Sequence, residues 1–387
     1  MKIKKHSFYY LSILIWHLVG NFSLAIALSV EDSNLQNKQL SNPSFQAQNP
    51  DNSQAQNYLE QAKLKLQSGE YERALADYNR VIELDSNIAE AFNGRATVHS
   101  LLNEPEAALP DYNRAIELEP DNAQFFNNRG IIHSDLGQND KALADYNRAI
   151  TLDPKYNNAY TNRGKLYADS QQFELALRDY NRAIELDPQD VGAFFNRGNL
   201  YNSLGEPEKE LADYNRAIEV ATDSKLQSSN AVTVLEQIYF NRGLLYTELG
   251  KPKAAISDFD RTIEINPKNA KAFHSRGLIY RDRGETELAL KDFATAIELN
   301  PEYAIAYTNR GVLYFRAKQL DTALSNFETA VKLDPQLADA VVNRGLVYQQ
   351  LGFTAKAKED LNRAAELFRQ QGKTESYNQI KQMLQQF

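Results

Sequence analysis

Residues 123–156, AQFFNNRGIIHSDLGQNDKALADYNRAITLDPKY, contain the pattern that decides the fold. The first half has the pattern of a helix from Ala123 to Leu136, which Gly137 breaks, and the second half has that of a helix from Asp140 to Leu152. Asp153-Pro154 ends the second helix, because the residue before a proline avoids the helical region. The stretch therefore predicts a pair of helices joined by a short turn.

This helix pair recurs along the chain with a period of 34 residues. The string Asp-Tyr-Asn-Arg of residues 145–148 is found five times, and the string Asn-Arg-Gly of residues 128–130 is found six times. A fixed period of this length is the signature of a repeat architecture. An insertion, residues 225–235, separates the fifth unit from the sixth. The nine predicted units are residues 55–88, 89–122, 123–156, 157–190, 191–224, 236–269, 270–303, 304–337 and 338–371.

The units resemble tetratricopeptide repeats (TPRs) through their period and their order of aromatic, small and proline residues. In the fourth unit this series is Tyr160, Gly164, Tyr167, Ala176, Tyr180, Ala183 and Pro188. The Asn-Arg-Gly string is common in bacterial TPR proteins. The resemblance implies an all-α fold, a right-handed α-α superhelix (a TPR solenoid) of nine helix-turn-helix repeats. It also implies that the first helices line a concave groove that holds a protein or peptide partner.

Three parts of the array depart from the pattern. The first unit has Glu60-Gln61-Ala62 in place of Asn-Arg-Gly, which suits an end repeat, and Thr374 to Phe387 has the spacing of a C-terminal capping helix within residues 372–387. The fifth unit has Glu210 at a small-residue position. A carboxylate there needs water or a partner. We therefore predict a seam at the insertion with lengthened helices on both sides, and first proteolytic cleavage within Gln227-Ser228-Ser229-Asn230.

The N-terminal region has the features of an export signal followed by a tether. Residues 1–27 combine three lysines, an apolar run and a small-residue cleavage site, which predicts a signal peptide and an exported protein, periplasmic or secreted. The alternative is a membrane anchor formed by residues 8–30. Residues 28–54 are rich in Ser, Asn and Gln without an apolar period, which predicts a disordered linker.

Composition excludes several classes of function for the 387-residue chain. Its 43 basic and 51 acidic residues give a net charge of −8, which argues against nucleic acid as a partner, because that affinity rests on neutralised phosphates. There is no cysteine, and no nucleotide, metalloprotease or nucleophile motif is present. Because the repeats and the tail use up the chain, no catalytic domain is predicted and no cofactor is expected.

Two histidines occupy the same position in neighbouring units. His99 and His133 stand where later units have tyrosines such as Tyr167, so they are either a metal-binding pair or packing residues with local polar contacts. A third ligand at matching spacing is missing from the sequence, so no metal site is predicted.

A recurring arginine and a recurring acid are predicted to form ion pairs. Arg129 and its equivalents lie in the packed arc of the first helix, where a charge must be paired. Pairing each acid of the second helix with the next unit's arginine, as Asp111 with Arg129, would use every arginine. This inter-repeat pairing is our prediction, and the alternative is that the arginines reach water.

The opposite side of the first helix is predicted to form the binding groove. Asparagines recur there, and their amides can pair with the backbone of an extended peptide. Beside them, Lys165 and Asn199 give way to apolar residues in the C-terminal half. The predicted groove residues are Asn128, Asn162, Asn196, Asn241, Asn309, Asn343, Leu244, Leu278, Val312 and Leu346.

Two alternatives to this groove remain open at the level of sequence. The asparagines could instead tie neighbouring helices together. The protein could also be an accessory or assembly subunit of an envelope complex that binds through its convex face or its caps.

Overall fold

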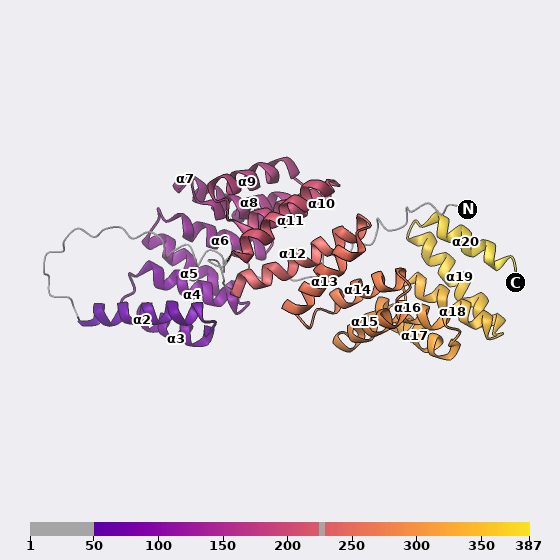
Figure 1. Ribbon diagram of the computed structural model, residues 1–387. Coiled ribbons are helices and arrows are strands. Elements are labelled where there is room, and N and C mark those ends of the chain that lie inside the picture. The colour runs from indigo at the N-terminus through magenta and orange to yellow at the C-terminus, as the bar shows by residue number, and fades with distance from the viewer. Residues whose placement is uncertain (1–49, 224–228) are drawn as a thin grey trace. The chain divides into compact units, whose positions relative to one another are not determined.

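The computed structural model describes residues 50–223 and 229–387, and all regular secondary structure in these residues is helical (Figure 1). The predicted signal segment, most of the predicted linker, and Gln227 and Ser228 of the predicted cleavage site lie outside the described residues. The chain divides into two compact units, the first ending at Val234 and the second running from Leu235 to Phe387. Among the described residues, no helix is both long enough and apolar enough to cross a membrane.

The first unit consists of helix pairs that follow the predicted repeats. The pairs are α2 (Pro50–Gln67) with α3 (Tyr71–Leu84), α4 (Ala89–Leu101) with α5 (Pro105–Leu118), α6 (Ala123–Asp135) with α7 (Asn139–Leu152), α8 (Asn157–Asp169) with α9 (Phe173–Leu186), and α10 (Val191–Leu204) with α11 (Pro207–Thr222).

The second unit continues the same pattern after α12 (Ser229–Glu248), a helix that crosses the boundary between the units. Helix α12 precedes α13 (Pro252–Ile265) in the chain. The following pairs are α14 (Ala270–Asp282) with α15 (Thr286–Leu299), α16 (Ala304–Arg316) with α17 (Leu320–Leu333), and α18 (Ala338–Gln350) with α19 (Thr354–Gln370), after which α20 (Thr374–Leu384) ends the array.

The turn inside each pair depends on one residue with left-handed backbone. Gly137 has a φ of 69°, and the amide of Gln138 after it donates back to the carbonyl of His133, which closes the end of α6. Most repeats have glycine at this position, where a side chain costs energy. Gln171 and Lys318 adopt the same conformation, with φ of 59° each, without being glycine.

In most repeats the pair is held together by an aromatic ring that packs on a glycine of the first helix. A Cβ atom on Gly130 would lie 2.7 Å from Cε1 of Tyr146, and one on Gly164 would lie 2.9 Å from the ring of Tyr180. Both tyrosines are almost completely buried. The glycines therefore let the two helices approach closely, which explains the recurring Gly of Asn-Arg-Gly.

Repeats stack through their first helices. Helix α6 contacts α4 and α8, and α16 contacts α14 and α18, while within each unit second helices such as α5 and α15 also pack on the first helix that follows. No successive second helices among the described residues pack as closely. The first helices thus lie on the inner side of the curve within each unit.

The ends of the array agree with the predicted caps, with one correction. In α20, Ile380 is buried, and Tyr377, Leu384 and Phe387 pack on the same apolar cluster, so this helix covers the last repeat. The predicted linker ends too late, because residues 50–54 already form the start of α2. Pro50 at the first helical position suits that start, since its missing N–H would have no helical partner.

The predicted lengthening of helices at the insertion is also observed. Helix α11 has 16 residues and α12 has 20, against 13 or 14 in the other first and second helices between α3 and α18. Glu210 in α11 is only 2% exposed, and Nδ2 of Asn202 donates to both of its carboxylate oxygens at 3.1 Å. The buried acid thus has the partner it requires, and preferential cleavage near the insertion stays a prediction.

Candidate functional site

The recurring arginine is a bridge between three helices. In α6, Nε and Nη2 of Arg129 donate to the two oxygens of Asp145 at 2.9 and 2.7 Å, and Nη1 donates to Asn113 of the preceding repeat at 2.8 Å. Its guanidinium also lies 5.5 Å from the ring centre of Phe126. The same three bonds recur at Arg95, Arg163, Arg197 and Arg276, with Asp260 replacing the asparagine at the last.

The predicted pairing of each arginine with the acid of the preceding repeat is therefore wrong. Arg129 pairs with Asp145 of its own repeat and not with Asp111, which pairs with Arg95. The reason is the close helix approach at Gly130, where a Cβ would lie 3.3 Å from Cβ of Asp145. This approach brings the acid beside the neighbouring arginine, and only the Asn113 contact joins different repeats.

The first repeat solves the same problem with a different residue. In this repeat Gln61 stands where later repeats have the arginine. The carboxylate of Asp77 accepts instead from Nζ of Lys65, which lies one helical turn after Gln61. The sequence analysis overlooked Lys65. Its spacing from Gln61 was the available signal, since residues four apart lie on the same helix face.

The arginines are consequently structural and fully charged. Hydrogen bonding to Asp292 raises the pKa of Arg276, against the opposing effect of burial, and hydrogen bonding to Asp360 does the same for Arg344. A buried carboxylate such as Asp179, 3% exposed, is stable only beside such a partner.

The predicted asparagine row has different environments in the two units. In the first unit Asn128 is 1% exposed and donates to Asn93 of the preceding repeat at 3.1 Å, and Asn162 donates to Asn127 at 2.9 Å. These two side chains thus tie first helices together, as the structural alternative describes. Asn196, Asn241, Asn309 and Asn343 are half-buried.

Gly94 breaks this asparagine row for a steric reason. A Cβ atom at Gly94 would clash with the ring of Tyr78 from the preceding repeat. Tyr78 belongs to the first repeat, which has Ala62 instead of the usual glycine. Its ring therefore occupies the space that an asparagine would need.

A buried histidine, one residue before the row position Ser275, bonds to the row in the second unit. His274 is 6% exposed, and its Nε2 accepts from Nδ2 of Asn309 at 3.0 Å while its Nδ1 lies 3.2 Å from the hydroxyl of Tyr303. Nη1 of Arg281 donates to Oδ1 of Asn309, which fixes the orientation of that amide. Burial, and to a smaller extent the charge of Arg281, lowers the pKa of His274 to about 4. The sequence analysis assigned this histidine no role.

The predicted apolar row lies on the first helices of the second unit. Leu244 is 39% exposed, although it is a large apolar side chain, and Leu278, Val312 and Leu346 are half-buried. These four residues occupy the same position in successive repeats. In the first unit the position holds Thr97, the buried Ile131, Lys165 and Asn199, so the row of apolar residues is continuous only in the second unit.

The two stacked histidines make local contacts. Nδ1 of His99 lies 2.7 Å from Glu104, and Nδ1 of His133 lies 3.0 Å from Gln138, each in the turn after its own helix. This agrees with the packing interpretation. The described residues contain no group of three or more His, Asp or Glu side chains suited to a metal ion.

Comparison with protein families identifies the repeats. Models described as "TPR repeat" match residues 132–171, 164–205, 277–318 and 313–352, and models described as "Tetratricopeptide repeat" match residues 59–99, 89–122, 111–144, 191–224, 236–269 and 338–371. Together these segments cover well over half of the chain. The chain belongs to the tetratricopeptide repeat family.

Several solved structures are similar to parts of this chain. The APC/C hetero-tetramer Cut9-Hcn1 matches with a TM-score of 0.50 at 14% identity, over 88% of this chain and 78% of that one. A tetratricopeptide repeat protein from Parabacteroides merdae ATCC 43184 matches with a TM-score of 0.47 at 20% identity, over 67% and 99% of the two chains. YrrB, described as a TPR protein with an unusual peptide-binding site, has a TM-score of 0.43 at 23% identity, over 51% and 95%. No curated protein matches in sequence.

Two acids of the first TPR unit were missed by the sequence analysis. Asp135 and Asp169 occupy the same position in successive repeats, at the ends of α6 and α8. Burial of the carboxyl raises the pKa of Asp135 to about 6 and also raises the pKa of Asp169, and the charge of Lys165 opposes both shifts. Both side chains are nevertheless exposed at the surface, so the neighbouring helices remove only part of their solvent.

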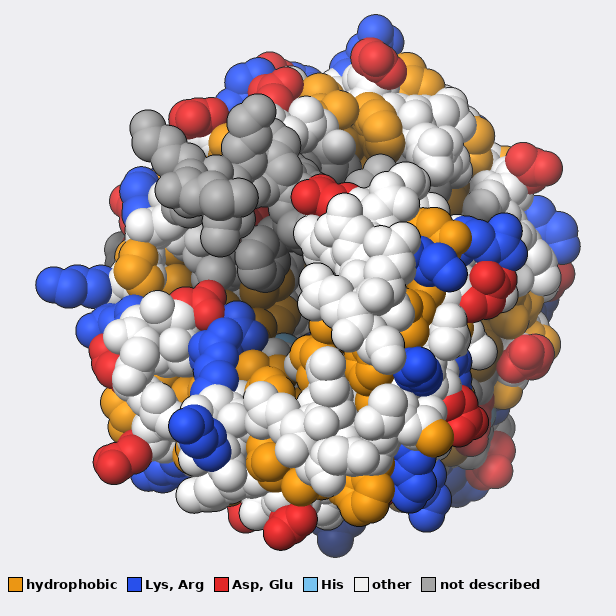
Figure 2. Space-filling view, turned by 90° about the vertical axis from the view of Figure 1, so that its right-hand side faces the viewer, with side chains coloured by type: hydrophobic (Ala, Val, Ile, Leu, Met, Phe, Trp, Pro, Cys, Tyr) orange, Lys and Arg blue, Asp and Glu red, His pale blue; other side chains and the backbone are white. Residues whose placement is uncertain are grey.

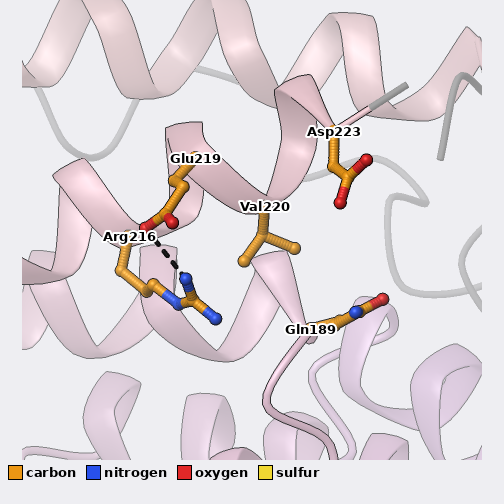
Figure 3. A pocket seen from close by; sticks show the side chains of 5 residues that line it. All are labelled: Gln189, Arg216, Glu219, Val220 and Asp223. Carbon is orange, nitrogen blue, oxygen red and sulfur yellow. Dashed lines mark ion pairs between the residues drawn. The ribbon is translucent and has the colours of Figure 1, made fainter. Parts of the chain in front are cut away.

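One hollow of this TPR chain lies at the end of α11 (Figure 3). It is lined by Gln189, Arg216, Glu219, Val220 and Asp223, and Arg216 and Glu219 form an ion pair across it. Its volume is about 70 Å³. Sites for small ligands are several times larger, so this hollow holds water at most.

Proposed function

We propose that this TPR protein is a non-enzymatic scaffold that binds a protein or an extended peptide along the first helices of its second unit. The observation that carries the proposal is the apolar row of Leu244, Leu278, Val312 and Leu346. Apolar side chains that stay partly exposed at the same position of successive repeats favour a partner with apolar side chains. Each would gain affinity when that partner excludes water from it.

The half-buried asparagines beside this row would supply polar contacts. Asn241, Asn309 and Asn343 could pair with a peptide backbone through amide groups, which both donate and accept. To donate to a peptide, Asn309 would have to exchange its bonds to His274 and Ile305. We extend the proposal to Asn196, whereas Asn128 and Asn162 are buried and already bond within the protein.

The proposal also covers the location and the class of partner. Residues 1–27 support export to the periplasm or the exterior, with anchoring by residues 8–30 as the alternative, and the Asn-Arg-Gly strings support a bacterial subtype. A net charge of −8 disfavours nucleic acid. The face shown in Figure 2 agrees, because acidic and basic side chains are interspersed over it. Cell fractionation with N-terminal sequencing of the isolated protein distinguishes cleavage from anchoring.

Peptide selection tests the proposed groove. The purified chain selects binders from a displayed peptide library, and the enriched peptides are measured against a variant with Asn at positions Leu244, Leu278, Val312 and Leu346. We expect apolar peptides that lose at least about tenfold in affinity for this variant, since each leucine contributes about 1 kcal/mol or more when covered.

A matched control separates the groove from general hydrophobicity. Leu299 and Leu333 are each 37% exposed, close to Leu244, but lie at the ends of second helices. The double variant Leu299→Asn/Leu333→Asn should keep the affinity. Equal affinity of all three proteins for the selected peptides would refute the groove.

A further inference from the structure

Arg310 departs from the rule that the other recurring arginines follow. Its Nε donates to Oδ1 of Asn326 at 2.8 Å, and this is its one hydrogen bond among the described residues. Where the other repeats have an aspartate, Asn326 offers a single acceptor, because its Nδ2 donates to the carbonyl of Thr322. The Nη2 group of Arg310 has therefore lost the second oxygen that Asp145 provides to Arg129.

The second partner of Arg310 is missing as well. In other repeats Nη1 reaches an asparagine of the preceding second helix, as Arg163 reaches Asn147 at 2.6 Å. The equivalent residue before Arg310 is Ala294 in α15, which has no acceptor in its side chain. Arg344, in the next repeat, keeps both bonds to Asp360. Arg310 therefore lacks both the second carboxylate oxygen and the Nη1 acceptor that other recurring arginines have.

The vacant donors lie at the outer side of the array. The equivalent Nη1 bonds, from Arg95 to Asn79 and from Arg129 to Asn113, are at the exposed surface of second helices. The guanidinium of Arg310 is held in place by Asn326 and by the ring of Tyr307, whose centre is 5.4 Å away. Arg310 is half-buried, and its Nη1 group is the one that corresponds to the exposed bonds of the other repeats.

Charges of both signs flank this position, because Glu298 on the surface of α15 lies one helical turn after Ala294. At the outer face of α17, Lys332 stands where α3, α5, α9, α11 and α13 have a glutamate paired with an arginine. The nearby acid Glu328 accepts from the hydroxyl of Tyr348 in the following repeat. Arg310 has no carboxylate of its own, unlike every other recurring arginine from Arg95 to Arg344.

We propose that Arg310 is a carboxylate-binding site between α15 and α17 that receives an Asp or Glu side chain of a partner protein. The two Nη groups would donate to the two carboxylate oxygens, which is the paired geometry that arginine favours. The partner's carboxylate would supply the negative charge and the hydrogen-bond acceptors that Ala294 and Asn326 lack. This site lies on the second-helix side, so it is independent of the proposed groove and supports contact through the convex face.

The test replaces Ala294 and Asn326 with the asparagine and aspartate that other repeats have at these positions. The probes are a fluorescein-labelled decapeptide of alternating Glu and Gly and a matched Gln and Gly decapeptide. We expect the native chain to bind the Glu peptide about tenfold more tightly than the Gln peptide, with a preference that weakens with salt. The variant Ala294→Asn/Asn326→Asp should lose the preference while its melting temperature rises or stays equal, so unfolding cannot explain the loss.

A second set of measurements identifies the source of the anion. Peptide binding should shift the Nε–Hε NMR signal of Arg310, assigned with Arg310→Gln, and inorganic phosphate at the same charge concentration should displace the peptide poorly. Efficient displacement by phosphate would make a free anion the ligand and overturn the proposed protein partner. An unchanged Arg310 signal, no preference in the native chain, or a preference that persists in the filled variant would overturn the site itself.

Discussion

The two units use the same packing residues and differ in what they expose. In both units an aromatic ring packs on the glycine of the first helix, as Tyr146 does on Gly130 and Phe293 does on Gly277. On the inner side, however, the first unit ties Asn128 to Asn93, whereas the second exposes Leu244. Packing positions therefore stay constant because the helix distance depends on them, and the positions that differ are those at which we propose a partner binds.

The sharpest test of the shared framework compares one arginine from each unit. Arg163→Met leaves the buried Asp179 without its partner and should cost about 3–5 kcal/mol of unfolding free energy. Arg310→Met removes one bond to the neutral Asn326 and should cost about 1 kcal/mol. Chemical denaturation of both variants checks the difference, and equal losses would show that the two arginines are equivalent.

Acid should affect the two units in opposite directions through the buried His274 and the partly desolvated Asp135. The pKa of His274 is about 4 in the folded chain against 6.5 ordinarily, so the unfolded chain binds more protons between these values and stability falls as the pH drops through them. The total effect is at most about 3 kcal/mol. For Asp135, whose pKa is raised to about 6, the folded chain binds more protons, so its contribution is lost as the pH rises through 6.

Hydrogen exchange of each unit from pH 4 to 7 measures this contrast. His274→Phe, which introduces the residue found at the equivalent positions Phe195 and Phe240, should remove the acid sensitivity around α14. Asp135→Asn should affect only the first unit, with the opposite sign. Acid sensitivity of α14 that persists in His274→Phe would assign it to other groups.

Completing the asparagine row should be tolerated in one unit only. Gly94→Asn places a Cβ where the ring of Tyr78 lies and should cost about 2 kcal/mol, as overpacking of a core does. Ser275→Asn, at a half-buried position, should change stability by less than about 0.5 kcal/mol. Melting temperatures of the two variants decide, and a stable Gly94→Asn protein would show that Tyr78 can move aside.

The smallest expected effect concerns the turns. Gln171 in the first unit and Lys318 in the second have left-handed backbone, which glycine adopts without the cost of a side chain. Gln171→Gly and Lys318→Gly should each stabilise by about 0.5–1 kcal/mol, because the relief of strain outweighs the added freedom of the unfolded chain. Gly137→Gln is the reverse control and should destabilise. A lower melting temperature for both glycine variants would contradict this account.

The local sequence pattern determined the helices, their period and their ends. Gly137 and Pro154 predict where helices stop, because backbone conformations near glycine and proline depend on neighbouring residues alone. The spacing of Tyr377, Ile380 and Leu384 likewise predicts the capping helix from one apolar face. The apolar row could also be predicted, because the sequence itself shows that Leu244 and Leu278 replace Lys165 at the same repeat position.

Only the tertiary structure decided which partners these residues have. Asp111 lies 16 residues after Arg95, and Asp77 lies 18 residues before it, so sequence separation does not distinguish the two acids. The close helix approach within the repeat selects Asp111, and the same approach leaves the fork of Arg310 without acceptors where Asn326 and Ala294 replace them. Distances between helices depend on side-chain volumes across the contact, such as Tyr78 against Gly94, and a periodic sequence does not contain that information.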